Sequence, residues 1–318
     1  DILNEVSSVL KKRLDFERCA ILLVNEDRTQ LKFRGGYGYT KKHLKIFDNI
    51  LFRLERPDTD DLLVRCFCEN RSILINDLNS QQLHLSERSL RIAEHLGVNS
   101  LICSPICVEG EPIGVLIMDT PRSQRPLVQT DLSLLEGVTP SLGTSLHNVN
   151  LLKEKEDQFE TLLAVMSASI DARDSLTRGH SVKVTEYALD ICQVMQMNED
   201  FCETIRVAAL LHDYGKLAIP DGILKKPGKL TPTEYEQIKT HAQKTGDILR
   251  QINFKESLSE VPNIAEAHHE KLDGSGYPYG LKGEDIPLGA KIIAVADIFE
   301  ALTAEPHYRS SLQTGVAR

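Results

Sequence analysis

Ionisable side chains stand inside apolar stretches in the second half of the chain, and this pattern limits how the chain can fold. His212 and Asp213 follow the apolar run 207–211, and Asp297 lies within the apolar run 292–299. A buried carboxylate needs a hydrogen-bonding partner or a metal ion, because its charge is otherwise costly to remove from water. We therefore expect the fold to bring these groups together with others that compensate their charge.

Two adjacent histidines, His268 and His269, end a short predicted helix and stand directly before a glycine-rich loop. The loop 273–280 contains three glycines and one proline. Neutral imidazole is a common metal ligand, and glycine lets the backbone come close to a bound group. A single histidine near a helix is usually a surface or core residue. The joint occurrence of several ionisable residues in apolar surroundings instead indicates a functional site.

Helix signals punctuate the same half of the chain. Thr231-Pro-Thr-Glu234 is a capping box with proline at the first helical position, and it predicts a helix that carries His241 and runs to about Arg250. Pro287 predicts the start of another helix, which carries Asp297. These signals indicate an all-helical second domain.

The His212-Asp213 pair and the His268-His269 pair lie in blocks that resemble those of the HD-GYP family of phosphodiesterases. The first block, residues 212–216, reads His-Asp-Tyr-Gly-Lys. The second block, residues 268–278, reads His-His-Glu-Lys-Leu-Asp-Gly-Ser-Gly-Tyr-Pro and matches the family pattern without a gap. The resemblance implies an all-α HD-type domain that hydrolyses cyclic di-GMP with the help of metal ions.

The resemblance also implies a ligand set of five histidines and two aspartates around two metals. Asp213 would bridge the metals, one of which would take His180, His212 and Asp297, and the other His241, His268 and His269. Nitrogen and oxygen ligands without thiolate suit iron, manganese, nickel or zinc, and the family implies iron or manganese. Members with three metals carry a glutamate four residues before the first histidine, where this chain has Leu176. We therefore expect two metals, with His180 as a looser ligand or a substrate contact.

The catalytic residues implied by the resemblance are Asp213 and Lys216. A metal pair lowers the pKa of a bridging water, and the resulting hydroxide can attack a phosphodiester. Lys216 would then aim its ammonium at a phosphate oxygen or the leaving group, unless it is only a solvated lysine. The implied substrate contacts are Lys216, Asp273, Gly274, Gly276, Tyr277, Pro278 and Arg309. Arg309 ends the sequence Pro-His-Tyr-Arg, where the family tends to read Arg-Pro-Tyr-Arg, so the first arginine is missing.

Residues 1–150 are typical of a mixed α/β domain. A helix is expected over residues 1–14, and strands are expected at residues 19–24, 31–34, 72–75, 99–108 and 112–118, the last two forming a hairpin. This order resembles a GAF domain, a small-ligand sensor module. Four cysteines in this domain, Cys66, Cys68, Cys103 and Cys107, do not have zinc-type spacing. We favour small buried hydrophobes over a metal or iron–sulfur site.

A long helix is predicted over residues 131–172 between the two domains. Its apolar residues recur every three or four positions: Leu135, Val138, Leu142, Leu146, Val149, Leu152, Phe159, Leu163, Met166 and Ile170. Either each half packs against its own domain, or the helix pairs with a second copy in a parallel homodimer. We expect the dimer, because the polar patch 153–158 suits a linker better than a core.

The whole chain has 318 residues and a net charge of −9, without a basic run, which argues against nucleic-acid binding. It has no apolar run near 18 residues that could span a membrane. Seven cysteines at irregular spacing favour reduced thiols in the cytoplasm. Because the chain begins at Asp1 rather than Met, we expect a preceding segment, and the family pattern suggests a continuation past Arg318.

The overall expectation is an α+β GAF-like domain, residues 1–150, joined by the connecting helix 131–172 to an all-α HD-GYP domain, residues 160–318. Its activity would be hydrolysis of cyclic di-GMP to linear pGpG or onward to GMP, regulated by an unknown small ligand of the GAF-like domain. Two alternatives are open. The substrate could be another cyclic dinucleotide such as cyclic GMP-AMP, or the site could be an inactive nucleotide-binding module.

Overall fold

The computed structural model describes residues 11–12, 16–54, 61–78, 85–121, 125–173, 179–254 and 256–303. It forms two compact units, Asp1–Glu154 and Lys155–Arg318. The first is α+β and the second is all helical, which confirms the predicted fold class. Most of the helix predicted over residues 1–14 lies outside the described residues, as do Leu176 and Arg309. None of the described helices has the length and apolar character needed to cross a bilayer.

The first unit is built on one antiparallel sheet of six strands. The strands are β1 (Arg18–Val24), β2 (Gln30–Tyr37), β3 (Phe52–Arg53), β4 (Ile73–Ile75), β5 (Leu101–Val108) and β6 (Glu111–Asp119). They lie in the order β3-β2-β1-β6-β5-β4. The predicted hairpin is the β5–β6 pair, whose turn residues Glu109 and Gly110 both have positive φ, at 52° and 89°. The predicted strands are thus confirmed.

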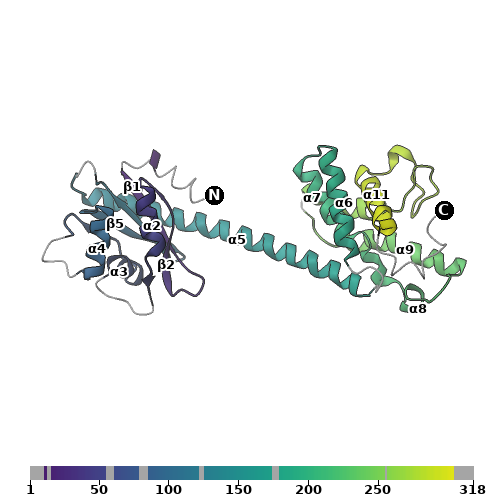
Figure 1. Ribbon diagram of the computed structural model, residues 1–318, viewed down its shortest axis with the longest axis horizontal. Coiled ribbons are helices and arrows are strands. Elements are labelled where there is room, and N and C mark those ends of the chain that lie inside the picture. The colour runs from purple at the N-terminus through teal and green to yellow at the C-terminus, as the bar shows by residue number, and fades with distance from the viewer. Residues whose placement is uncertain are drawn as a thin grey trace. The chain divides into compact units, whose positions relative to one another are not determined.

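Alternating side chains of the sheet form two separate apolar cores. Ala20 and Leu22 of β1 face the core that packs against α2 (Lys41–Asn49), α3 (Leu62–Cys68) and α4 (Glu87–Leu96). Cys19 and Ile21 face the opposite core, to which the first half of α5 (Gln129–Arg173) contributes (Figure 1). The burial of neighbouring residues on opposite faces is what the period of two in a strand dictates. Each face of the sheet is therefore covered by its own helical layer.

The four cysteines of the first unit form no metal site among the described residues, as the sequence predicts. Cys66 of α3 and Cys103 of β5 are fully buried in the core under α2–α4, whereas Cys68 is exposed. The groups of side chains that could hold a metal within the described part of the chain contain histidine and aspartate but no cysteine. The buried thiols are small hydrophobes, as the spacing predicts.

Helix α5 contributes to both units, and half of the residues of its apolar stripe are buried there. Leu135, Leu142 and Leu146 lie in the core of the first unit. Leu163 and Ile170 are each 2% exposed within the second unit. At these positions the sequence pattern therefore reflects packing within each unit. These buried residues are not available to contact a second copy of the chain. The exposed apolar residues of α5 are Leu134, Leu151, Leu152, Leu162 and Val165.

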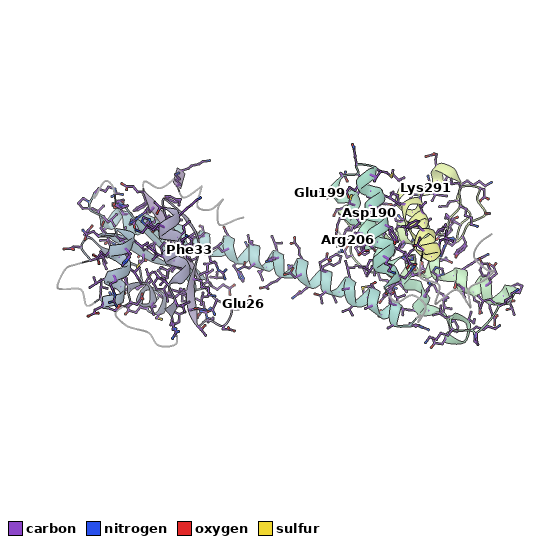
Figure 2. The ribbon with its side chains drawn as sticks, in the orientation of Figure 1. Glu26, Phe33, Asp190, Glu199, Arg206 and Lys291 are labelled. Carbon is purple, nitrogen blue, oxygen red and sulfur yellow. The ribbon has the colours of Figure 1, made fainter. Side chains whose placement is uncertain are left out.

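The second unit begins within α5 and contains further helices around one core. They are α6 (His180–Val194), α7 (Glu199–Leu211), η1 (Tyr214–Ala218), α8 (Asp221–Leu224), α9 (Pro232–Leu249), η2 (Glu256–Leu258), α10 (Val261–Glu266), η3 (Gly283–Asp285) and α11 (Leu288–Thr303). Arg206 of α7 joins α5 through Glu160 at 2.6 Å and also pairs with Glu203 (Figure 2).

Local signals in the sequence set the ends of the helices that carry the candidate site. The capping box at α9 is present: the backbone N–H of Thr231 donates to Glu234 at 2.7 Å, and the Thr231 hydroxyl accepts from the Glu234 N–H at 3.3 Å. The apolar run that ends α7 is buried, so His212, which caps that helix, is drawn into the interior. Burial of an apolar helix thus carries the first ligand pair inside.

Replacing Leu163 by alanine should lower the free energy of unfolding of the helical unit by about 2–5 kcal/mol, because the leucine is fully packed. Leu163 is 2% exposed, whereas Val194 at the end of α6 is 85% exposed. The control Val194→Ala should change the free energy by no more than about 0.5 kcal/mol. Urea titrations followed by circular dichroism measure both, and equal losses would contradict the assignment of the stripe to this core.

Candidate metal centre

Three nearly fully buried histidines share one hydrogen-bonding pattern. In His212, His241 and His268, Nδ1 bonds the backbone carbonyl oxygen three residues earlier. These acceptors are Ala209 at 2.6 Å, Ile238 at 2.7 Å and Ala265 at 2.6 Å. The proton is therefore on Nδ1, and Nε2 carries the lone pair. Each of the three Nε2 atoms lacks a hydrogen-bond partner within the described part of the chain.

The candidate ligands converge on one carboxylate. Asp213 shares a group with His241, His268 and His269, and a second group with His180 and His212. In each group the potential ligand atoms lie within 4.8 Å of one another. The remaining predicted ligand, Asp297, has its Oδ1 3.1 Å from Nε2 of His180. The structure thus brings all seven sequence-predicted ligands together, from α6, α9, α11 and the segments that follow α7 and α10.

The residues present fit divalent metal ions. Unpaired imidazole nitrogens in a protein interior are unfavourable unless another group occupies them. Their neutral lone pairs, together with a shared carboxylate, form the nitrogen and oxygen donor set that iron, manganese, nickel and zinc accept. One potential metal-binding group has four residues and centres on His241, His268 and His269. The other has three residues, His180, His212 and Asp213.

Asp213 is held as a charged carboxylate. Its Oδ2 lies 2.6 Å from Nζ of Lys216 and 3.5 Å from Nε2 of His212, and its Oδ1 lies 3.2 Å from Nε2 of His241. Burial alone would raise the pKa of Asp213, but the charge of Lys216, the largest opposing cause, holds it well below its ordinary value. Lys216 therefore lies at the centre of the site and compensates Asp213.

The buried imidazoles are held neutral. Burial lowers the pKa of His212 and places that of His268 well below its ordinary value. Burial also lowers the pKa of His269 to about 3, with the neighbouring His241 adding to the effect. Neutral imidazole is the form that ligates a metal, so no proton has to leave these rings at neutral pH.

His180 has a different environment, which includes a carboxylate that sequence reasoning missed. Its Nδ1 lies 2.7 Å from Glu300 Oε2, while its Nε2 faces Asp297. Burial would lower the pKa of His180, but the bond to Asp297 and the charge of Asp213 raise it to about 9. Glu300 is three residues after Asp297 on α11, and that spacing places both on one face of the helix. The spacing could have indicated Glu300.

Thr245 and Gly215 fix α9 against the turn that carries Asp213. The Thr245 hydroxyl donates to the carbonyl of His212 at 3.0 Å and accepts from the N–H of Gly215 at 2.8 Å. A Cβ atom at Gly215 would lie 2.0 Å from the carbonyl oxygen of His241. The glycine is thus required by the close approach of two backbones. Thr245 has no signal in the sequence pattern.

The glycine-rich loop is anchored by Glu270, a further residue to which the sequence pattern assigns no role. Its carboxylate accepts three backbone N–H groups, those of Tyr279 at 2.7 Å, Gly280 at 3.1 Å and Leu281 at 3.0 Å. Tyr277 lies over His269, with ring centroids 4.7 Å apart. A carboxylate that holds successive amides gives a loop a defined shape. The loop is therefore tied to the His268-His269 pair at both Glu270 and Tyr277.

The remaining loop residues shape the backbone. The Asp273 carboxylate accepts from the N–H of Ser275 at 2.9 Å and from its hydroxyl at 2.7 Å, so it closes a local turn. Gly274 has a φ of 82°, and the Tyr277–Pro278 peptide is cis. A Cβ at Gly276 would lie 2.3 Å from the backbone N of Lys271. These residues set the loop's path past the site.

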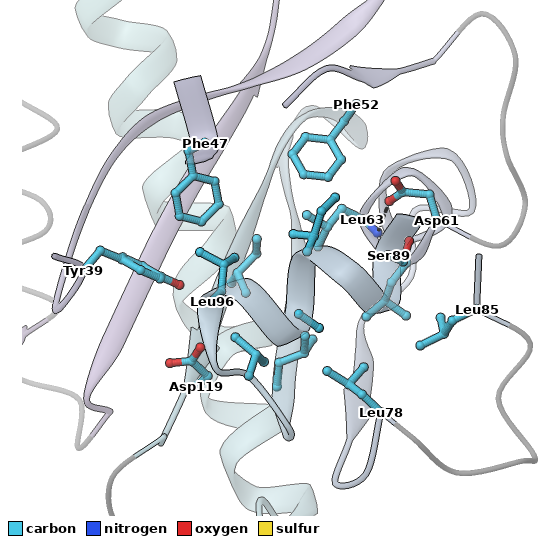
Figure 3. Close-up of a pocket in the computed structure, with 16 residues that line it drawn as sticks. Tyr39, Phe47, Phe52, Asp61, Leu63, Leu78, Leu85, Ser89, Leu96 and Asp119 are labelled. Carbon is cyan, nitrogen blue, oxygen red and sulfur yellow. Dashed lines mark hydrogen bonds between the residues drawn. The ribbon is translucent and has the colours of Figure 1, made fainter. Parts of the chain in front are cut away.

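A separate small cavity lies in the first unit. It has a volume of about 70 Å³ and is lined mainly by apolar side chains from α2–α4 and the sheet. Tyr39 and Asp119 lie on one side of it, and Asp61 and Ser89 lie on the other (Figure 3). Asp119 forms a buried two-bond ion pair with Arg18 at 2.7 Å. The cavity suits a small, largely apolar group.

Comparison with known proteins identifies both units. Residues 1–146 match the GAF domain, and residues 164–317 match an HD domain. The chain therefore matches a GAF domain followed by an HD domain, each over slightly less than half of its length, and Gly276-Tyr277-Pro278 resembles the HD-GYP motif.

Similar proteins include phosphodiesterases for two cyclic dinucleotides. The chain is 41% identical over 157 residues to a cyclic di-GMP phosphodiesterase of Thermotoga maritima, covering 49% of this chain and 42% of that protein. It is 38% identical over 160 residues to a cyclic di-GMP phosphodiesterase response regulator of Xanthomonas campestris, covering 50% and 42%. It is 36% identical over 187 residues to a 3'3'-cGAMP-specific phosphodiesterase of Vibrio cholerae, covering 58% and 35%. The chain spans less than half of the length of each of these relatives.

Replacing Gly215 by alanine should disrupt the metal centre, because the added Cβ would overlap the backbone of α9. We expect a loss of about 1–3 kcal/mol in the free energy of unfolding and weaker binding of Mn(II). Gly222 of α8 is a matched control, since its Cβ would meet nothing within 4 Å. Calorimetric titration with Mn(II) and urea unfolding compare the variants, and wild-type metal affinity in Gly215→Ala would disprove the packing argument.

The stability of the metal-free protein should fall as pH rises through about 9, because the folded pKa of His180 is raised to about 9 from an unfolded value of about 6.5. Stability from the His180 ion pairs is complete below the unfolded pKa and disappears above the folded one. His180→Gln should flatten this dependence between about pH 6.5 and 9. The exposed His95 supplies the control, His95→Gln. Urea midpoints that depend on pH in the same way in His180→Gln and in the wild-type chain would exclude the assignment.

Proposed function

We propose that this chain is a metal-dependent phosphodiesterase that hydrolyses cyclic di-GMP to linear pGpG, with a slower second cleavage to GMP. The observation that supports it most is the set of buried Nε2 atoms on His212, His241 and His268 without a hydrogen-bond partner among the described residues. Leaving such atoms unpaired costs about 1–3 kcal/mol each, and ligation would remove that cost. The substrate class is supported by the names of the similar proteins.

Seven side chains would hold two divalent cations, for which we favour iron or manganese. Asp213 would be shared, with His180, His212 and Asp297 on one side and His241, His268 and His269 on the other. When bound, such a pair activates water and neutralises the charge of a phosphodiester. Lys216, beside Asp213, would offer its ammonium to a phosphate oxygen or to the leaving oxygen. Glu300 would orient His180 through Nδ1.

The loop after His268 and His269 would bind the nucleotide. The residues that we assign to it are Asp273, Gly274, Gly276, Tyr277 and Pro278, with Arg309 outside the described residues. Tyr277 lies over the His269 ring and offers an aromatic face for guanine. Asp273 and the glycines would act through the shape of the loop, since the Asp273 carboxylate is used within its own turn.

Cyclic GMP-AMP is the alternative substrate, favoured by the similarity to a phosphodiesterase named for 3'3'-cGAMP at 36% identity. A catalytically inactive nucleotide-binding module is a further alternative. The presence of every predicted ligand in one cluster argues for catalysis over binding alone.

The free cysteines of the described chain suit a reducing compartment, and we propose the cytoplasm.

Protein purified without oxygen and loaded with Fe(II) or Mn(II) should convert cyclic di-GMP to pGpG, as resolved by liquid chromatography, with 3'3'-cGAMP assayed in parallel. Lys216→Ala should lower kcat about 100-fold with less effect on KM, since its ammonium acts on charge that develops in the transition state. Lys291 on α11 supplies the control, Lys291→Ala (Figure 2). If the metal-loaded protein binds cyclic di-GMP without cleaving it, the enzyme proposal is rejected in favour of a nucleotide-binding module.

The regulatory part of the proposal concerns α5 and the GAF domain. We propose that the cavity beside Tyr39 and Asp119 holds a small ligand. We also propose that the chain forms a parallel homodimer along the exposed apolar residues of α5. Those residues include Leu151, Leu162 and Val165, which are 39%, 61% and 61% exposed. The residues first assigned to the seam, such as Leu142 and Leu163, are instead used by the cores of their own units.

Glutamate at Leu162 should weaken association at micromolar concentration, because it places charge on the exposed face of α5. The control Lys155→Glu changes charge at an exposed polar position of the same helix. Sedimentation velocity measures the change, with circular dichroism to show that the helical unit is intact. A wild-type chain that sediments as a monomer would reject the dimer.

A further inference from the structure

The last turn of α5 contacts the chain segment that directly follows Lys216. The guanidinium of Arg173 donates to the carbonyl oxygens of Leu217 and Ile219, the latter at 2.7 Å. It also donates to Oδ1 of Asp221 from Nη2 at 2.9 Å and from Nε at 3.1 Å. A single side chain of α5 therefore binds every second residue, Leu217, Ile219 and Asp221, after the proposed catalytic lysine.

The segment held by Arg173 is one hydrogen-bonded turn that includes Lys216. The N–H of Lys216 donates to the carbonyl of Asp213 at 2.9 Å, and the N–H of Ile219 donates to the carbonyl of Lys216 at 3.1 Å. Lys244 of α9 donates to the carbonyl of Ala218 at 3.1 Å. Cationic side chains thus bind three consecutive carbonyls at the end of η1, where the helix dipole favours positive charge.

The same turn of α5 also holds the beginning of α6. Asp171 Oδ2 accepts from the N–H of Gly179 at 2.6 Å, and Oδ1 accepts from the Ser181 hydroxyl at 3.3 Å. Gly179 is the N-cap residue of α6 and has no side chain to cap it. Asp171 of another helix instead accepts the N–H of this N-cap residue, the group that the N3 side chain accepts in a capping box. His180 lies between the two residues that Asp171 holds.

We propose that Asp171 and Arg173 are positioning residues that couple the end of α5 to two groups of the metal centre, His180 and Lys216. This inference rests on the proposed function for its catalytic readout. Because α5 also contributes to the GAF domain, a change in the path or rotation of this helix would reach both groups together. Neither residue belongs to the ligand groups, so both act through the segments that they hold.

The chemistry of the guanidinium makes this coupling stiff. Its donors lie in one plane in a fixed fork, and bonds from a charged donor are about twice as strong as neutral ones. The side chain of Arg173 is 28% exposed, so water replaces these bonds only in part. A displacement of α5 must therefore move the turn with it or break several bonds together. Small errors in the placement of a catalytic group cost up to about 100-fold in rate.

Arg173→Gln tests the inference against Arg206→Gln in the full chain loaded with Mn(II). Arg206 also ties α5 to the helical unit, with two bonds to Glu160 at 2.6 and 3.0 Å, but it holds no segment of the metal centre (Figure 2). We expect Arg173→Gln to lower kcat for the cyclic dinucleotide about 10- to 100-fold with KM changed less than about twofold. Arg206→Gln should change both less than about twofold, and Arg173→Lys should restore part of kcat.

Hydrogen exchange supplies a readout that does not depend on turnover. Amides of residues 214–221 should exchange faster in Arg173→Gln than in Arg206→Gln, because only the first variant releases that turn. Equal turnover and equal exchange in the two variants would overturn the inference. If the wild-type chain cleaves no cyclic dinucleotide, the proposed function fails. Faster exchange of residues 214–221 in Arg173→Gln than in Arg206→Gln would then still support the coupling, and equal exchange would overturn it. If Arg173→Gln does not fold, Arg173→Lys takes its place in the same comparison.

Discussion

The charge of one buried carboxylate organises the helical unit. Asp213 lies in the interior, and the ammonium of Lys216 at 2.6 Å keeps it ionised. A buried charge of this kind is stable only where several elements supply compensating groups. The groups come from the end of α7, from η1 and from α9, and the segment that follows α10 provides the adjacent imidazoles. The packing of these helices therefore also assembles the site.

Local patterns in the sequence predict much of this arrangement, because they report contacts that lie within one helix or one turn. The capping box at Thr231 sets the start of α9, and the apolar run before His212 indicates its burial. Contacts between distant segments leave no such pattern. Thr245 joins α9 to the turn of Asp213, and Glu270 ties down its loop, through bonds that only the tertiary fold creates.

The stripe on α5 shows a second limit of sequence patterns. A spacing of three and four marks an apolar helix face but does not say which surface covers it. At Leu142 and Leu163 the covering surface is the core of the unit to which each residue belongs. The same helix ends in Asp171 and Arg173, whose bonds reach the segments around His180 and Lys216. Its end is thereby part of the architecture of the metal centre.

Diffraction from crystals loaded with Mn(II), collected near the manganese absorption edge, tests the central claim most directly. We predict two anomalous peaks in each chain, both adjacent to Asp213, with the Nε2 atoms of His212, His241 and His268 turned toward them. Asp213→Asn crystals should lose both peaks, since the shared charge is removed. Crystals of the loaded wild-type chain without a peak beside these imidazoles, or with peaks away from Asp213, would contradict the account.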